Sequence, residues 1–402
     1  MTAQNPSTTG TESTTARSGL ARRDAIKLGA AAALATTGAV VAPQSAVAQQ
    51  QRNAPLKFRP DGTYKIVQFN DTQDDEQTDR RTVELMEKVL DSEQPDFVVM
   101  NGDNIAGGCE SGLEMKQAMN NVVRPMEDRK IPWAITFGNH DEDSTPQGGM
   151  DEADQLDFYR SYPCNRNQPS PDAVTGTANN SLLIQGSRTS DPKFNLFLID
   201  SGRYAPEEIA GQNIEGYPGW DWIRMNQIEW YAQTSREVER EAGRLVPALL
   251  FIHIPLWEYR FMWWGSVDGR TAADHARGVD RHGIVGERNE DECPGPFNSG
   301  MFSAILDRGD VKGVFCGHDH VNTYSGDYYG VLLGYAGNAG FGTYGLPGAE
   351  RNRLRGARVF ELDENTENVL VDTRMVWAKD FGIDLTADDQ PMEPFPLPPH
   401  QR

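Results

Sequence analysis

The chain of 402 residues carries 59 acidic and 38 basic side chains, which gives a formal net charge of −21 at pH 7. A field of this sign repels phosphate backbones and anionic lipid, so we expect no nucleic-acid binding and no adsorption to anionic membranes. Apolar residues make up 38% of the chain and glycine adds 39 residues, a composition that excludes disorder throughout.

The first fifty residues have the pattern of a targeting segment. A Ser/Thr-rich leader precedes Arg22-Arg23 and Lys27, and the apolar run 28–41 that follows is shorter than the ~20 residues needed to span a bilayer. Ala46-Val47-Ala48 supplies a small-x-small cleavage site. The segment resembles a twin-arginine (Tat) export signal. A buried Ala-rich helix is the alternative, but no amphipathic pattern supports it.

This resemblance implies that residues 1–48 are a signal peptide, that the Tat translocation machinery is a partner, and that the mature protein is periplasmic or extracellular. No later segment is long and apolar enough for a stable membrane anchor. We expect a linker at 49–60, one catalytic domain at 61–380 and a loose, proline-rich tail at 381–402.

From residue 64 onward, short β-branched or aromatic runs alternate with helical patterns, which is typical of an α/β fold. Apolar runs predict strands at 64–69, 96–101, 133–137, 195–199, 248–252 and 313–316. Apolar stripes at helical spacing predict helices at 80–90, 224–241 and 300–308. The C-terminal third predicts antiparallel strands at 328–335, 357–362 and 369–376.

The four cysteines permit up to two disulfides in three pairings, and the sequence selects none of them. Cys316 ends an apolar run and is expected to be a buried thiol. A dense aromatic cluster follows His253, and it predicts either packing under a loop or a lid over a site. Its members are Trp257, Tyr259, Phe261, Trp263 and Trp264.

Nearly every predicted strand is followed by a polar residue that can bind a metal. Open α/β sheets bind ligands beyond the carboxyl ends of their strands. Histidine and carboxylate together are the usual ligands of Zn, Mn and Fe. These residues are Asp71, Asp103, Asn139, His140, His253, His318 and His320.

Each of these residues has an ordinary structural explanation when it is taken singly. Asp71 or Asp103 could cap a following helix, and His253 could be a hydrogen-bonded core histidine. His318 and His320 are harder to explain in this way, because residues two apart in extended chain point to the same side. The combination favours a metal site.

Five motifs occur in order over residues 64–321: Asp71-Thr72-Gln73, Gly102-Asp103-Asn104, Gly138-Asn139-His140-Asp141, His253, and Gly317-His318-Asp319-His320. As a set they resemble the calcineurin-like metallophosphoesterase superfamily, and their particular forms look like its purple-acid-phosphatase-like branch. The resemblance implies an α/β fold (α+β in some schemes), namely a β-sandwich flanked by helices with ligands at the strand C-terminal ends. Ala106 stands where a purple acid phosphatase has a tyrosine ligand, so a tyrosinate-iron site is not expected.

The resemblance also implies two metal ions, divalent or trivalent, with Mn, Fe, Zn or Mg as candidates. It assigns Asp71, Asp103 and His320 to one metal, and Asp103, Asn139, His253 and His318 to the other, with Asp103 bridging. His140 would stabilise the transferring phosphoryl group or protonate the leaving alkoxide. The implied function is an exported phosphatase that hydrolyses phosphorylated small molecules, phosphomonoesters first, by attack of a metal-bound hydroxide.

Gln73 departs from the family pattern, which has histidine at this position. An amide oxygen is a weaker ligand than imidazole for Zn or Fe(II) and is more acceptable to Mn, Mg or Ca. Asp74 and Asp75 could compensate, or they could form a solvated acidic loop. Because of this departure, a non-catalytic descendant of the same fold that binds phosphate or metal is an alternative to the phosphatase. A phosphodiesterase is the other alternative.

Overall fold

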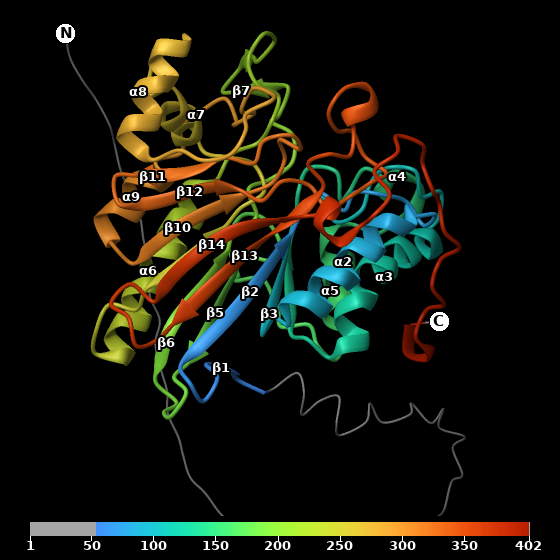
Figure 1. The fold of residues 1–402 in the computed structure, drawn as a ribbon, viewed down its shortest axis with the longest axis horizontal. Coiled ribbons are helices and arrows are strands. Elements are labelled where there is room, and N and C mark those ends of the chain that lie inside the picture. Colours follow the sequence, from blue (N-terminus) through green and yellow to red (C-terminus); the bar gives the residue numbers. More distant parts are fainter. Residues whose placement is uncertain (1–53, 402) are drawn as a thin grey trace, which may run out of the picture. The chain divides into compact units, whose positions relative to one another are not determined.

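Two large β-sheets pack face to face in the computed structural model, which describes residues 54–401 (Figure 1). The order in the first sheet is β1 (Leu56–Lys57), β5 (Asn180–Gln185), β6 (Pro192–Leu198), β9 (Ala248–Phe251), β10 (Val311–Cys316), β12 (Val331–Tyr335) and β11 (Ser325–Tyr328). The order in the second is β14 (Leu370–Trp377), β13 (Gly356–Asp363), β2 (Thr63–Phe69), β3 (Phe97–Asn101) and β4 (Trp133–Thr136). A separate ribbon joins β7 (Glu208–Ile209) to β8 (Gln212–Asn213).

Strand alternation produces the core between the two sheets, because successive side chains point to opposite faces. Ile66 of β2 packs between the sheets with Phe251 and Phe315, which come from the other sheet. Val67, its neighbour, belongs instead to the core on the outer face of the five-stranded sheet. The five-stranded sheet is therefore apolar on both faces, and its outer face requires a covering layer of helices.

Helices cover both outer faces. On the five-stranded sheet, buried residues come from α2 (Arg80–Glu93), α3 (Gly112–Arg129) and α5 (Glu152–Arg160). On the seven-stranded sheet they come from α6 (Met225–Ala242), α7 (Trp257–Trp264) and α9 (Met301–Arg308). The remaining helical elements are α4 (Thr145–Gly148), α8 (Ala272–His282) and the 3₁₀ turns Gly348–Glu350, Ala378–Phe381 and Pro399–Gln401.

The predicted α/β sandwich is confirmed, and the predicted helices and all but one of the predicted strands are found to within a few residues. The exception is the expected strand at 328–335, which a turn at 329–330 divides between β11 and β12, so that Asp327 pairs with Leu332 in a hairpin. The helices α4, α5, α7 and α8 were not predicted, and neither was α3. Its pattern is obscured by Pro125 and by two buried asparagines, Asn120 and Asn121, whose partners lie far away in the sequence.

One partner that both asparagines share, Phe395, belongs to the C-terminal segment, which is packed and not loose as the sequence suggested. Asn120 Nδ2 donates to the carbonyl of Phe395 at 3.1 Å, and the N–H of Phe395 donates to Asn121 Oδ1 at 2.9 Å. At the other end, Leu56 and Lys57 of the expected linker pair with β5. The folded part therefore extends beyond the predicted 61–380 on both sides.

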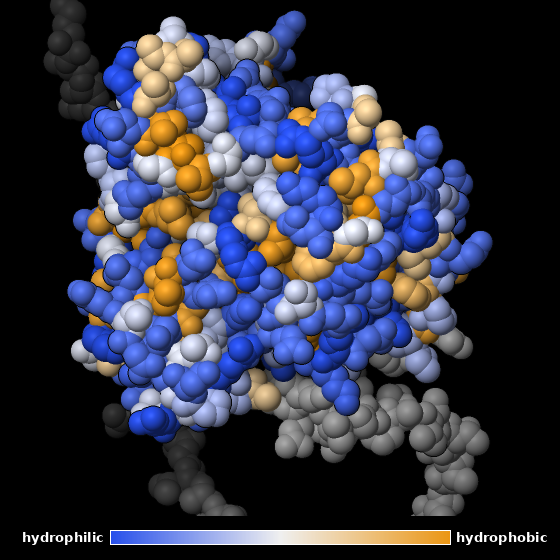
Figure 2. Space-filling model, in the orientation of Figure 1, coloured by the Kyte–Doolittle hydropathy of each residue, from blue (hydrophilic) through white to orange (hydrophobic). Residues whose placement is uncertain are grey.

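The cysteines of the described chain are free thiols, and Cys316 is buried as expected. Among residues 54–401, no helix combines the length and the apolar character needed to cross a bilayer. On the face shown in Figure 2, apolar residues form separate patches between polar ones. The predicted export signal and its cleavage site lie outside the described residues.

Candidate metal centre

The predicted ligands follow five strand ends that belong to two different sheets. Asp71, Asp103 and Asn139 come after β2, β3 and β4 of the five-stranded sheet, whereas His253 and His318 come after β9 and β10 of the other. These five residues are buried, with at most 7% of any of them exposed. The sandwich therefore brings the carboxyl ends of both sheets together at one place.

The donor atoms form two groups that share Asp103. The first group is Asp71, Asp103 and His320, and the second is Asp103, His253 and His318; within each group the donor atoms lie within 4.8 Å of one another. His253 Nε2 is 3.0 Å from Asp103 Oδ2, and His320 Nε2 is 3.4 Å from Asp71 Oδ1. Asp103 is thus the residue common to both groups.

A further group joins Cys293 and Asp319 to His318. The carboxylate of Asp319 already accepts a hydrogen bond from the hydroxyl of Tyr335 at 2.5 Å. The pKa of Asp319 is raised well above its usual range by burial, which favours the neutral form. A neutral carboxyl is a poor metal ligand, so this group is the weaker candidate.

Several buried polar atoms at the centre lack hydrogen-bond partners, namely Asp103 Oδ2, Asn139 Oδ1 and His253 Nε2. Leaving such atoms unpaired is costly unless an ion or water binds them. His253 Nδ1 lies 3.0 Å from the carbonyl of Asn101, which can only accept, so Nδ1 carries a proton and Nε2 is the ring atom that faces the carboxylates and is available to an ion. Metal-ligating histidines are held in this way, and the residues present therefore fit a metal site.

The electrostatics of the cluster also favour a cation. Burial alone would lower the pKa of His253, but the carboxylates of Asp103 and Asp71 raise it to about 10. The same interactions hold the pKa of Asp103 below its usual range, against the opposing effect of burial. Burial and the charge of His253 lower the pKa of His318 to about 3, so its ring is neutral and can bind an ion.

The loops that carry the ligands are tightly constrained. Asp71, Asp103 and His318 have φ values of 53°, 48° and 74°, in the left-handed region that non-glycine residues seldom adopt. A Cβ on Gly138 would lie 2.3 Å from Asp103 Oδ1, so only glycine allows this approach. Strain and close packing of this kind are typical of functional sites.

Gln73 lies beside the first group, is 9% exposed and has a φ of 21°. Its Oε1 accepts a hydrogen bond from the hydroxyl of Thr343 at 3.0 Å, and the same hydroxyl is 3.3 Å from His320 Nδ1. Gln73 is thus linked to a candidate ligand through Thr343. Asp74, the possible substitute, accepts from the N–H of Asp79 at 2.7 Å and belongs to neither group.

His140 stands at the edge of the centre, with 33% of its side chain exposed. Its N–H donates to Asp103 Oδ1 at 2.8 Å, and its Nδ1 is 2.5 Å from Asp143 Oδ2. Burial lowers the pKa of His140, but the hydrogen bond to Asp143 and the charge of Asp103 outweigh it, and the pKa is raised overall. The ring is therefore oriented and poised to hold a proton.

The sequence did not reveal the two residues that position this ring. Asp143 could have been found as a second carboxylate just after the Gly-Asn-His-Asp motif. Arg203 has no local signal, because it is 60 residues away; it donates to Asp143 Oδ1 at 2.8 Å and to the carbonyl of Asn139 at 3.1 Å.

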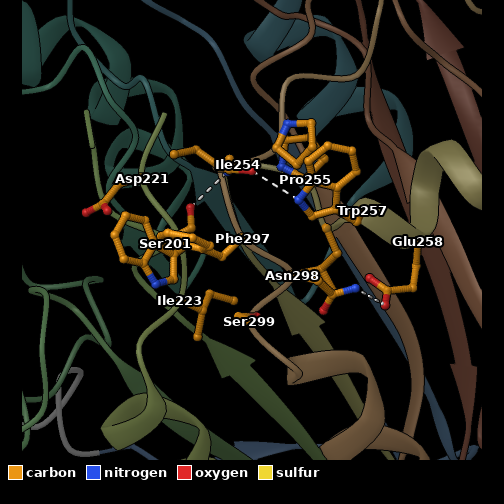
Figure 3. A pocket seen from close by; sticks show the side chains of 14 residues that line it. Ser201, Asp221, Ile223, Ile254, Pro255, Trp257, Glu258, Phe297, Asn298 and Ser299 are labelled. Atoms are coloured by element: carbon orange, nitrogen blue, oxygen red, sulfur yellow. Dashed lines mark hydrogen bonds between the residues drawn. The ribbon is translucent and has the colours of Figure 1, made fainter. Parts of the chain in front are cut away.

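The aromatic cluster after His253 is mainly packing. Tyr259 is fully buried in the core under the seven-stranded sheet, and Trp263 stacks on His275 at 3.9 Å. A cavity of about 20 Å³ lies beside the start of α7, between Ser201, Trp257 and Phe297 (Figure 3). This is about the space that one water molecule needs, so the cavity is too small for a substrate.

A family model described as calcineurin-like phosphoesterase matches residues 64–322. A relative from Arabidopsis thaliana named "Probable inactive purple acid phosphatase 14" is 30% identical over 82% of this chain and 88% of its own length. Phosphatase DCR2 from Saccharomyces cerevisiae is 28% identical over 72% of this chain and 47% of its own. A solved dimetal phosphatase from Danio rerio is 12% identical in sequence and has a TM-score of 0.44. The match covers 78% of this chain and 99% of the solved chain. By the extent of the family match and the identity to the Arabidopsis relative, the chain belongs to the calcineurin-like phosphoesterase family.

Proposed function

We propose that the protein is a metal-dependent phosphoesterase that hydrolyses phosphate esters, phosphomonoesters first. The observation that carries the proposal is the pair of donor groups sharing Asp103, with unpaired buried atoms beside the half-buried His140. Asp71, Asp103 and His320 would hold one ion, with Gln73 as a further candidate ligand. The second ion would be held by Asp103, Asn139, His253 and His318. Such ions supply Lewis-acid polarisation of phosphoryl oxygens and lower the pKa of water at the site.

The residues of the chain then have separate tasks. Asp103 contributes to both donor groups, and its Oδ1 accepts a hydrogen bond from the backbone N–H of His140. His140 donates a proton to the oxygen of the leaving alcohol, a role that contributes typically 10²- to 10⁴-fold. Asp143 orients the ring through Nδ1, and Arg203 holds Asp143 in place. A protein that only binds phosphate has no need of His140.

A non-catalytic phosphate- or metal-binding protein is the second candidate. The Arabidopsis relative carries the word "inactive" in its name, and Gln73 stands where the family pattern has histidine. Gln73 Oε1 also accepts a hydrogen bond from Thr343, which leaves it one lone pair for an ion. This candidate predicts bound metal without turnover.

The test combines metal analysis with hydrolysis assays. Protein purified without chelator is assayed with p-nitrophenyl phosphate and the corresponding diester, with Mn, Zn, Fe or Mg added. His140→Ala should keep the metal and lose about 10²- to 10⁴-fold in kcat, whereas Asp103→Asn should lose both. His275→Ala, a histidine outside both donor groups, is the matched control. Loss of metal in His140→Ala, or full activity in it, would refute the assigned roles.

We also propose export through the Tat machinery, on the basis of Arg22-Arg23 and the short apolar run that follows. Replacing both arginines by lysine should retain the precursor in the cytoplasm. Arg17→Lys, in the same leader, should be exported as the natural protein is. Normal export of the double variant would contradict the proposal.

A further inference from the structure

The segment between β6 and α6 returns to the metal centre at two points. Tyr204 lies beside His140, with ring centroids 6.4 Å apart and planes at 86°. Trp220 lies beside His318, with centroids 4.5 Å apart and planes at 87°. The Tyr204 hydroxyl is also 3.5 Å from Asn139 Nδ2. Two aromatic rings thus contact residues that belong to the proposed catalytic site.

These two rings form one unit, which we call the aromatic shelf. Tyr204 and Trp220 are backbone partners in an antiparallel bridge, and the N–H of Ala205 donates to the carbonyl of Gly219 at 2.8 Å. Their ring centroids are 5.7 Å apart with planes at 34°. The shelf is therefore held by the main chain at the base of the segment that carries the β7–β8 hairpin, labelled at β7 in Figure 1.

The shelf is accessible and is not part of the core. Tyr204 is 44% exposed, in contrast to the fully buried Tyr231 and Tyr259, and neither shelf residue belongs to the apolar clusters of the interior. An apolar ring left partly open beside a catalytic group is typical of a ligand-binding surface.

Charge narrows the class of ligand. Arg203, which precedes Tyr204 in the chain, forms ion pairs with Glu142 at 3.0 Å and with Asp143 at 2.8 Å. Its charge is thus already neutralised by two carboxylates and is not available as a clamp for a second phosphate. A polyphosphate substrate would require free cationic side chains, whereas the shelf offers aromatic rings. The shelf therefore suits the uncharged part of a substrate.

We infer that Tyr204 and Trp220 bind a planar ring in the alcohol part of a substrate that carries a single phosphate. This inference rests on the proposed function, because the phosphate itself would occupy the metal centre. The ring would pack on the shelf while the ester oxygen lies within reach of His140. Aromatic pairs in offset or edge-to-face geometry gain affinity beyond the area they bury.

The test uses phosphonates, which bind without being hydrolysed. The protein is titrated calorimetrically, in the presence of Mn, with 2-phenylethylphosphonate, 2-cyclohexylethylphosphonate and propylphosphonate. We expect the phenyl compound to bind about tenfold more tightly than the propyl compound, and about threefold more tightly than the saturated ring. Hydrolysis of the corresponding phosphate esters is measured in parallel, since all three release a primary alcohol of similar basicity.

Variants then locate the preference. Tyr204→Leu and Trp220→Leu should each reduce the phenyl-to-propyl ratio to about threefold or less, whereas Tyr204→Phe should retain it. Tyr217→Leu is the matched control, because Tyr217 is 70% exposed on the same segment and makes no ring contact with the centre. Metal content is measured for each variant to show that the site is intact.

The outcomes separate the two proposals. Equal affinities in the natural protein, or a ratio unchanged in both leucine variants, would overturn the shelf even if all esters are hydrolysed. A phenyl preference without any hydrolysis would support the shelf and reject catalysis. If no phosphonate binds to the Mn-loaded protein, both proposals fail.

Discussion

Replacing Gly138 by alanine would test how closely the chain holds Asp103. The added Cβ would lie 2.3 Å from Asp103 Oδ1 and 2.4 Å from the backbone nitrogen of Asp103, whereas ordinary contact begins at 3.4 Å. The nitrogen cannot move by a side-chain rotation, so the loops after β3 and β4 must separate by about 1 Å. Asp103 belongs to both donor groups, and this shift therefore disturbs both.

A misplacement of about 1 Å can cost roughly 10²-fold in rate, and 10²-fold corresponds to about 2.7 kcal/mol. We expect kcat/KM for p-nitrophenyl phosphate to fall by about this factor, and the affinity for added Mn to fall with it. Hydrolysis assays and titration calorimetry measure the two effects. Thermal melting of the metal-free protein measures the accompanying loss of stability.

Gly309→Ala is the control for stability loss alone. Gly309 ends α9 with a φ of 72°, and a Cβ there would meet nothing within 4 Å. The left-handed conformation should cost roughly 1 kcal/mol in the free energy of unfolding and leave Mn affinity unchanged. If Gly138→Ala binds Mn and turns over like the natural protein, the described approach of Gly138 to Asp103 is wrong.

Two further predictions concern Gln73 and an ion pair outside the site. Gln73→His should tighten the weaker Zn site about tenfold, or about 1.4 kcal/mol, in titration calorimetry; two equally tight sites in the natural protein and no change in the variant would show that Gln73 is not a ligand. The hydrogen bond from Arg353 lowers the pKa of Glu287 from 4.5 to about 2. Because the pKa of Glu287 is lower in the folded state, its ionised carboxylate stabilises the folded protein above pH 4.5. This contribution disappears as the pH falls towards 2. Arg353→Gln should therefore be slightly less stable than the natural protein at pH 6, by an amount kept small because the pair is partly exposed, and urea titrations should show the difference narrowing with falling pH; a constant difference would contradict the assignment.

The sequence alone was sufficient for the α/β class and for most strands, because both depend on local periodicity. Ile66 and Val67 show why: alternate residues of one strand face the two cores. The candidate ligands were also visible, since each follows an apolar run at a strand end. Their chemistry, carboxylate with imidazole, indicated a metal before any contact was known.

The tertiary structure alone decided which distant residues meet. It placed β2 and β9 in separate sheets, so that Asp71 and His253 face one another although 182 residues separate them. It also paired Thr343 with Gln73, and it docked the C-terminal segment on the buried asparagines of α3. Such contacts leave no periodic signal, because they depend on how the two sheets pack and not on the residues next to them in the chain.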